Sequence, residues 1–331
     1  MPEIAQGRDY VVVPHAQVLD LPAQALRLAR AAFAGYAGVT LPTAGKVNWY
    51  LARPRMRRDL SMGAVTPTGM LVASVYITLE RVRLAGALEP VALVDTVMTD
   101  PEHRQRGLAR RTLSAALAAS RDAKAVAALL FTVPGSMPYH FYQTLGFRPV
   151  QEIAVLARQG SEAVLLGDAR VATPADAERL CAFWNHTYGA HNGYVPIDAP
   201  LFRWRRVDRP DVLPARTWLC PAEGPLLAAV NLCDAAVIGA PRRTIVLTDL
   251  AWAPAAPQAA QTLLASVPPG AEARLLAPES DVALHAVVAG QGFSEIGREA
   301  AMLAPLSAAG ERLLGELGAP WYALPESVIG V

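Results

Sequence analysis

Residues 103–112, HRQRGLARRT, have the residue types and spacing of an anion-binding turn. The arginines supply positive charge, and Gly107 and Ala109 carry so little side chain that an anion can approach the backbone closely. From Gly107 onward apolar residues recur at helical spacing, so the turn leads into a helix whose first N–H groups have no intrahelical partner. Because these N–H groups and the helix dipole favour negative charge, we expect the turn to hold a pyrophosphate.

A short buried strand is expected to position this turn. Residues 91–98 are mostly apolar β-formers, and the chain turns after them at Asp100–Pro101. Side chains alternate along a strand, so we expect one face to carry every second residue. These residues are Leu93, Asp95, Val97 and Thr99.

The spacing of the turn also has a simpler interpretation. Small residues often precede helices, and arginines on a surface are commonly just solvated. The stretch differs from a dinucleotide-binding GxGxxG and from a Walker A loop, which would require Gly-Lys-Ser/Thr. The elements around the turn therefore have to decide between the two interpretations.

The turn resembles motif A of the GNAT acyltransferase superfamily, whose Arg/Gln-x-x-Gly-x-Gly/Ala loop binds the pyrophosphate of coenzyme A. Residues 140–147, HFYQTLGF, resemble motif B, in which a helix with a tyrosine ends at Gly-Phe. We expect Gly146 at the helix C′ position and Phe147 at the start of a strand. Gly135 stands where the family often has an asparagine, which puts a side-chain hydrogen bond to the cofactor from that position in doubt.

The resemblance implies a set of cofactor-binding residues along the strand end and the turn. They are Val97, Met98, Thr99, Arg104, Gln105, Arg106, Gly107, Leu108, Ala109 and Arg110.

The resemblance extends over one whole domain. Residues 71–84 look like an antiparallel neighbour of the strand at 91–98, residues 125–133 like the next buried strand, and residues 23–33 like the first helix. Together they cover most of residues 9–158, and we place the first domain at residues 1–160.

The second part of the chain resembles a second copy. Near residue 173 a Thr-Pro pair suits the start of a helix. Three landmarks recur at similar offsets: Trp204 follows Trp49 by 155 residues, Pro254 follows Pro101 by 153, and Gly292 follows Gly146 by 146. The near-constant shift indicates a duplicated α/β fold, two tandem GNAT-type domains that each have a mixed, mostly antiparallel central sheet flanked by helices. The second domain is placed at residues 165–331.

The second copy lacks the residues of the proposed cofactor site. Residues 255–258, AAPQ, have neither the arginines nor the glycine of the turn, and Val288 stands where Tyr142 stands in the first copy. We therefore expect a degenerate domain that serves packing, shapes the acceptor pocket or dimerises. The tail from residue 311, with its Trp321–Tyr322 pair, could dock on the first domain or on a partner chain.

The implied reaction requires a base. A neutral amine attacks the thioester of an acyl-CoA, and an alkyl ammonium of pKa about 10.4 must first lose a proton. Asp95 is our first candidate, Glu80 the second and His140 a third. Asp95 could instead cap or hydrogen-bond locally, and the other two could be solvated side chains.

The leaving thiolate and the carbonyl oxygen each require a donor. The resemblance assigns the protonation of the thiolate to Tyr142, although an aromatic residue on a helix can simply pack in the core. A backbone N–H near Val97 or Met98, where the central strand is disrupted, would serve the carbonyl oxygen.

Composition excludes several classes of protein. The 331 residues are 53% hydrophobic and 18% charged, with a formal charge of +1, which gives no general attraction to nucleic acid. No apolar run approaches the roughly 20 residues of a membrane span. The three cysteines are widely spaced and no CxxC pair occurs, so we expect a cytoplasmic protein with neither disulfides nor a metal site. The arginine run at residues 53–58 is expected to be mainly a solvated face.

These observations predict a bacterial-type, cytoplasmic N-acyltransferase. It would use an acyl-CoA, with acetyl-CoA the expected donor, to acylate the amine of a small molecule, and it could form a homodimer. Two alternatives stay open: a protein that binds acyl-CoA without turnover, and a GNAT-fold enzyme that transfers acyl groups to oxygen or hydrolyses the thioester. The sequence identifies neither the acceptor nor the acyl length.

Overall fold

A computed structural model describes residues 10–36, 39–160 and 167–322 of the chain. The first half contains β1 (Val11–Pro14), α1 (Leu21–Phe33), α2 (Ala44–Leu51), β2 (Met62–Val65), β3 (Leu71–Leu84), β4 (Ala87–Thr99), α3 (Leu108–Asp122), β5 (Ala127–Thr132), α4 (Met137–Gln143) and β6 (Arg148–Gln159). The second half contains β7 (Arg170–Val171), α5 (Ala177–Tyr188), α6 (Ala199–Phe202), η4 (Arg203–Val207), β8 (Ala215–Cys220), β9 (Ala228–Ala235), β10 (Thr244–Trp252), α7 (Pro257–Leu264), β11 (Glu272–Pro278), α8 (Val282–Val288), β12 (Ser294–Pro305) and α9 (Ala308–Glu316).

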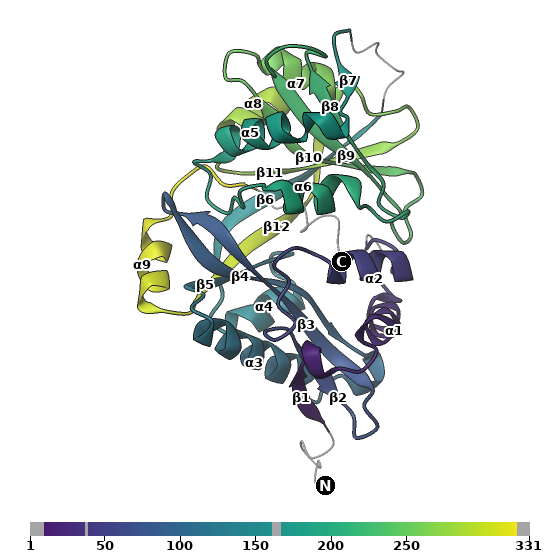
Figure 1. Cartoon of the computed structure of the whole chain (residues 1–331), viewed down its shortest axis with the longest axis vertical. Helices are drawn as coiled ribbons and strands as arrows, with labels where there is room; N and C mark the ends of the chain where they lie inside the picture. Colours follow the sequence, from purple (N-terminus) through teal and green to yellow (C-terminus); the bar gives the residue numbers. More distant parts are fainter. Residues whose placement is uncertain (1–9, 37–38, 161–166, 323–331) are drawn as a thin grey trace.

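The two halves share one twelve-stranded sheet with the order β1-β2-β3-β4-β5-β12-β6-β11-β10-β9-β8-β7 (Figure 1). Each half contributes six strands in the same order, and in each half the fourth and fifth strands form the parallel pair: β4 with β5, and β10 with β11. The last strands are exchanged, because β12 pairs with β5 and β6 pairs with β11. The fold class expected from the sequence is confirmed, and the exchange joins the two sheets into one.

The helices cover the two faces of the sheet in different ways. Apolar residues of α1, α2, α5 and α6 belong to one core cluster that spans both halves. On the other face α3 packs in a cluster of the first half, and α7 with α8 packs in a cluster of the second half. The face with α1, α2, α5 and α6 therefore carries the contact between the halves.

Two tryptophans lie at the centre of that contact. The rings of Trp49 and Trp204 stack with centroids 4.3 Å apart and planes 2° from parallel. Each indole N–H donates to the backbone carbonyl of the other residue, at 3.0 Å from Trp49 and 2.7 Å from Trp204. The landmark that recurs in the sequence is thus a reciprocal pair that fixes α2 against η4.

Local sequence explains several element boundaries. The helix expected from residue 23 begins at Leu21, because Pro22 suits a first turn in which its missing N–H costs nothing. β3 has the expected bounds. α4 ends at Gln143 and Thr144 is its C-cap residue. Gly146, with φ +88°, therefore lies one position after C′, in the turn before β6, whereas it was expected at C′ itself.

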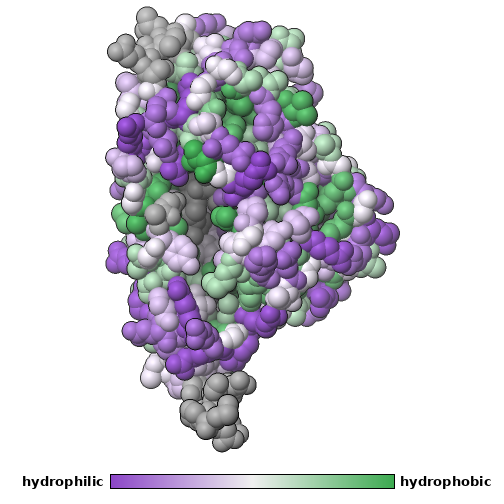
Figure 2. All heavy atoms as spheres, turned by 180° about the vertical axis from the view of Figure 1, so that it is seen from behind, coloured by the Kyte–Doolittle hydropathy of each residue, from purple (hydrophilic) through white to green (hydrophobic). Residues whose placement is uncertain are grey.

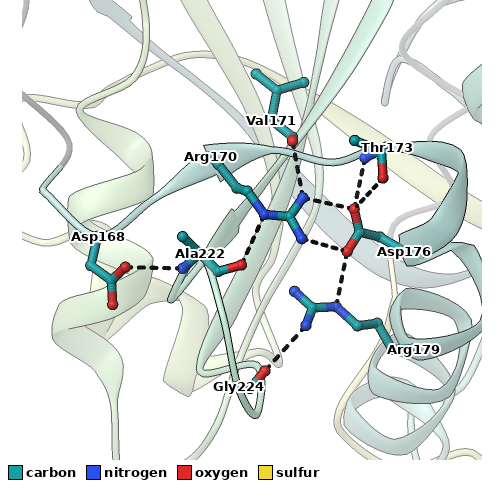
Figure 3. A network of polar contacts seen from close by, with 8 residues as sticks. All are labelled: Asp168, Arg170, Val171, Thr173, Asp176, Arg179, Ala222 and Gly224. Atoms are coloured by element: carbon teal, nitrogen blue, oxygen red, sulfur yellow. Dashed lines mark hydrogen bonds and ion pairs between the residues drawn. The ribbon is translucent and has the colours of Figure 1, made fainter.

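The second half begins with a polar network around Asp176 (Figure 3). Its carboxylate accepts hydrogen bonds from the backbone N–H and hydroxyl of Thr173, and Arg170 binds both of its oxygens at 2.7 and 2.8 Å. Arg179 adds an ion pair at 3.2 Å. Threonine thus caps the helix start as expected, and the same carboxylate ties β7 to α5.

The surface shows a mixture of residue types. Seen from behind, most of it is hydrophilic, and hydrophobic residues occur in separate patches (Figure 2). Within the described ranges no helix is both long and apolar enough to span a bilayer. No group of three or more His, Cys, Asp or Glu side chains among the same residues is placed to bind a metal ion.

Candidate functional site

The turn before α3 has the backbone geometry of an anion site. Gln105 and Gly107 both have left-handed φ, +60° and +70°, and Gly107 is the N-cap of α3. No side chain caps this helix end, and no acidic residue lies in its first turn. The first N–H groups of α3 are thus unopposed by negative charge, which fits a phosphate group.

Three exposed arginines surround this turn. Arg104 is held toward backbone carbonyls, including that of Ala32 at 3.2 Å, while Arg106 lies over the ring of Tyr10 at 5.7 Å. Arg110 donates to the hydroxyl of Thr144 at 2.6 Å. Their positive charges are therefore spread around the start of α3. Ala109 is half-buried in the first turn of the helix.

Leu108 contributes to the turn in a different way from its neighbours. Its side chain is 2% exposed and packs against residues of β2 and β3 such as Ala64 and Val72. It therefore anchors the start of α3 to the sheet, and only its backbone faces the anion site.

β4 and β5 separate beside this turn. They pair in parallel only from Val91 to Leu93, although β4 continues to Thr99. A β-bulge interrupts the pairing of β4 with β3 between Asp95 and Met98, and Thr96 has a left-handed φ of +47°. The disruption expected in the central strand therefore lies where the sequence places it.

The bulge corrects one expectation about side-chain direction. Leu93 and Met98 belong to the core on the α1 and α2 face, while Val97 packs in the cluster that contains α3. Leu93, Asp95, Val97 and Thr99 were expected on one face, but the additional residue at the bulge reverses the alternation. Asp95 and Val97 consequently point to opposite faces.

The Asp95 carboxylate lies in a polar cluster at the bulge. Its side chain is 25% exposed, and Nη1 of the buried Arg53 lies 3.4 Å from Oδ2. Burial and then the charge of Asp95 raise the pKa of the Tyr50 hydroxyl well above its usual value. The Arg53 guanidinium therefore holds the Asp95 carboxylate in place, and the carboxylate stays partly exposed to solvent.

Tyr142 lies close to this carboxylate. Its ring packs on Phe141 and Phe147 at centroid distances of 5.4 and 5.8 Å. Burial, followed by the negative charge of Asp95, raises the pKa of its phenol above the usual range. The charge of Asp95 thus acts on the Tyr142 hydroxyl, and the raised pKa keeps the phenol protonated, as a proton donor must be.

The other two base candidates have different surroundings. Glu80 is buried, and Arg55 binds its carboxylate at 2.5 Å while also binding Asp198 of the second half at 2.8 Å. Burial raises the pKa of Glu80 and the surrounding arginines oppose this. His140 is exposed and bonds Gln143 at 3.2 Å. Neither side chain approaches the bulge as Asp95 does.

Reasoning from the sequence missed two buried cations near the bulge. Arg53 has a side chain only 1% exposed, although the run at residues 53–58 was expected to be solvated. Lys46 on α2 is 2% exposed. It lines a small, largely apolar pocket together with Thr96 and Met98 of the bulge. Thr43 is the N-cap residue of α2, and its hydroxyl oxygen accepts a hydrogen bond from the backbone N–H of Lys46. A threonine three residues before Lys46 is a sequence signal for a helix start, which would have placed the lysine in the first turn of a helix.

The second half repeats the bulge, and a small pocket lined by Tyr188, Asp249 and Tyr322 lies beside it. β10 shifts register between Thr248 and Ala251, and Asp249 has φ +53°. Its carboxylate is bound by Arg206 and by the hydroxyl of Tyr322. The tail pair Trp321 and Tyr322 is therefore buried against its own chain, and residues 323–331 of the tail lie outside the described residues.

Residues 20–150 match the family model for the acetyltransferase (GNAT) domain. This part of the chain is a GNAT acetyltransferase domain. The match contains the turn, β4 with its bulge, and α4, and it confirms the resemblance drawn from the two motifs. The chain is accordingly an acyltransferase. No curated protein matches its sequence.

Solved structures share the fold over nearly the whole chain. A probable N-acyltransferase of Enterococcus faecalis is 17% identical with a TM-score of 0.64, over 90% of this chain and 72% of that one. A GCN5-related N-acetyltransferase of Anabaena variabilis is 12% identical with a TM-score of 0.65, over 91% and 74%. The Saccharomyces cerevisiae N-myristoyltransferase with bound myristoyl-CoA is 11% identical with a TM-score of 0.67, over 92% and 80%. The tandem GNAT-type fold is thus shared with these structures.

Proposed function

We propose that residues 1–160 transfer an acyl group, acetyl in the first place, from acyl-CoA to the amine of a small molecule. The observation that carries this proposal is the separation of β4 from β5 beside an uncapped helix end: the strands pair only to Leu93, and the α3 turn lies next to them. A thioester arm can lie along the unpaired part of β4 while the pyrophosphate binds the turn. The donor set expected from the sequence, residues 97–99 and 104–110, stays our proposal for this binding.

The proposed chemistry is direct attack of the amine on the thioester carbonyl. Asp95, held by Arg53, accepts the proton of the acceptor ammonium, directly or through water. A backbone N–H at the bulge, near Val97 or Met98, donates to the developing oxyanion. Tyr142 donates its proton to the departing thiolate, a role supported by its raised pKa. We propose that Glu80, which is buried and paired with Arg55, has a structural role and does not act as the base.

We also propose that residues 165–331 bind no acyl-CoA. The turn before α7 has neither the arginines nor the glycine of the turn before α3, and the Asp249 carboxylate at the bulge of β10 is already bound by Arg206 and Tyr322. The three cysteines are free thiols, which supports a reducing, cytoplasmic setting.

Calorimetric titration with acetyl-CoA and longer acyl-CoAs tests the first proposal. The variant Gly107→Asp places a negative charge at the turn, and Gly86→Asp is its matched control, because both glycines have left-handed φ and open space at the Cβ position. We expect one site per chain in the wild type and in Gly86→Asp, and at least tenfold weaker binding in Gly107→Asp.

Absence of binding by the folded wild type would refute the proposal, and so would equal affinities of the two variants. A screen of small amines with thiol detection then tests transfer. Binding without thiol release for any amine would favour a protein that holds acyl-CoA without turnover.

A further inference from the structure

Lysine is almost absent from this protein, and one of its two lysines lies beside the proposed thioester site. Of the 30 Lys and Arg residues only Lys46 and Lys124 are lysines. Lys124 is exposed after the end of α3, whereas Lys46 is 2% exposed. An arginine keeps its charge in proteins, while a buried lysine can lose its proton and become a nucleophile. Lys46 is therefore the one buried side chain of this kind.

The pocket of Lys46 reaches the bulge of β4. Its lining includes Lys46 and Tyr50 of α2 on one side and Thr96 and Met98 of β4 on the other. The lysine Nζ donates to the carbonyl of Thr40 at 3.1 Å, which holds the amine inside the protein. Apolar residues of α1, such as Ala25 and Ala29, complete the wall. An acyl group carried along β4 to the bulge would face this amine.

The charges around Lys46 favour its neutral form. Burial has the largest effect and the charge of Arg209 adds to it, while Asp95 and Cys233 act in the opposite direction, and together they lower the pKa of Lys46 to about 7. The neutral amine is therefore far more populated at neutral pH than it is in an exposed lysine. Asp95 of the first half and Cys233 of the second half favour the positive charge on Lys46, and Arg209 of the second half opposes it.

We propose that Lys46 is a self-acylation site, modified by the acyl-CoA bound to the same chain. The inference rests on the proposed function, because that function brings the thioester to the bulge. The Nζ lone pair attacks the thioester carbonyl carbon, the C–N bond forms and the C–S bond breaks, and the proton lost by nitrogen is taken up by the coenzyme A thiolate. The products are an N-acyl-lysine and free coenzyme A.

The modification is also favourable for the pocket. An acyl-lysine is neutral, so acylation removes a buried ammonium from an apolar pocket that Arg209 already makes unfavourable for positive charge. Because Lys46 is acylated once, the reaction stops after a single equivalent per chain.

Intact-protein mass spectrometry with peptide mapping tests the inference. The full chain is incubated with acetyl-CoA and no amine acceptor, and thiol release and acetyl-CoA binding are measured in parallel. We expect the mass of one acetyl group, located on Lys46, and one equivalent of thiol. Lys124→Arg should behave as the wild type. Lys46→Arg keeps a positive charge at this position and should incorporate no acetyl group. Lys46→Met serves the same purpose if the larger arginine side chain does not fit the pocket, and it should likewise incorporate no acetyl group.

The rate of incorporation should rise about tenfold per pH unit below pH 7 and level off above it, because the neutral amine reacts. Acetyl-CoA that binds without acetylating Lys46, or acetylation confined to Lys124, would overturn the inference and leave the proposed function intact. Absence of acetyl-CoA binding would overturn both.

Discussion

Replacing Tyr142 by phenylalanine should separate binding from catalysis. The substitution removes one hydroxyl and keeps the ring contacts with Phe141 and Phe147. We therefore expect the free energy of unfolding to change by less than about 1 kcal/mol and acetyl-CoA affinity to stay the same. A general acid contributes roughly 10²- to 10⁴-fold, so kcat should fall by that factor, or about 3 to 5 kcal/mol of transition-state stabilisation.

The pH dependence gives this prediction a second readout. Burial and the Asp95 carboxylate raise the pKa of Tyr142, so the wild-type phenol stays protonated from pH 6 to 9 and the loss should be uniform over that range. The assay is thiol release with the amine found in the screen, and Tyr139→Phe on the same helix is the control. Activity of Tyr142→Phe within twofold of the wild type, or a change confined to KM, would refute the role of the hydroxyl.

Two further predictions concern the framework of the site. Trp204→Phe removes the indole N–H that donates to the Trp49 carbonyl at 2.7 Å, so the free energy of unfolding should fall by about 2 kcal/mol in urea titrations, and a loss below about 0.5 kcal/mol would contradict the role of the pair. Burial lowers the pKa of His15 from 6.5 to about 4, so the unfolded chain takes up a proton between these values that the folded chain does not, and up to about 3 kcal/mol of stability is lost as pH falls from 6.5 to 4. His15→Gln should flatten that part of the pH–stability curve, and an unchanged slope would show that His15 is not its source.

The sequence predicts the elements that carry a regular pattern or a motif. β3 has the expected bounds because fourteen residues of β-forming character lie between turns. The turn before α3 and the helix after it follow from Gly107, because glycine adopts a left-handed φ more readily than residues with a side chain. The family resemblance singles out Tyr142, and the strand pattern singles out Asp95; their catalytic roles stay predictions.

Features that depend on tertiary structure could not be predicted. The residue types at positions 91–98 do not indicate that Thr96 has a left-handed φ. The regular alternation of side chains along a strand therefore predicts the wrong face for Val97. β6 and β12 have similar strand patterns, and the choice of partner that exchanges them is made across the whole sheet. Arg53 reads as a surface charge because its partners, Asp95 and the ring of Trp204, are far away in sequence.

The two bulges show how one fold supports unequal halves. Thr96 and Asp249 lie at equivalent points of β4 and β10, both with left-handed φ. In the second half the indole of Trp184 donates to the Asp249 carbonyl at 2.9 Å, and Tyr188 and Tyr322 complete a packed group of aromatic side chains. A pocket lies beside each bulge: Asp249 and Tyr322 line the one in the second half, and Lys46 and Thr96 line the one in the first. The bulged strand is thus present twice, and the two copies differ in the turn that follows it: arginines and Gly107 precede α3, whereas the turn before α7 has neither arginine nor glycine.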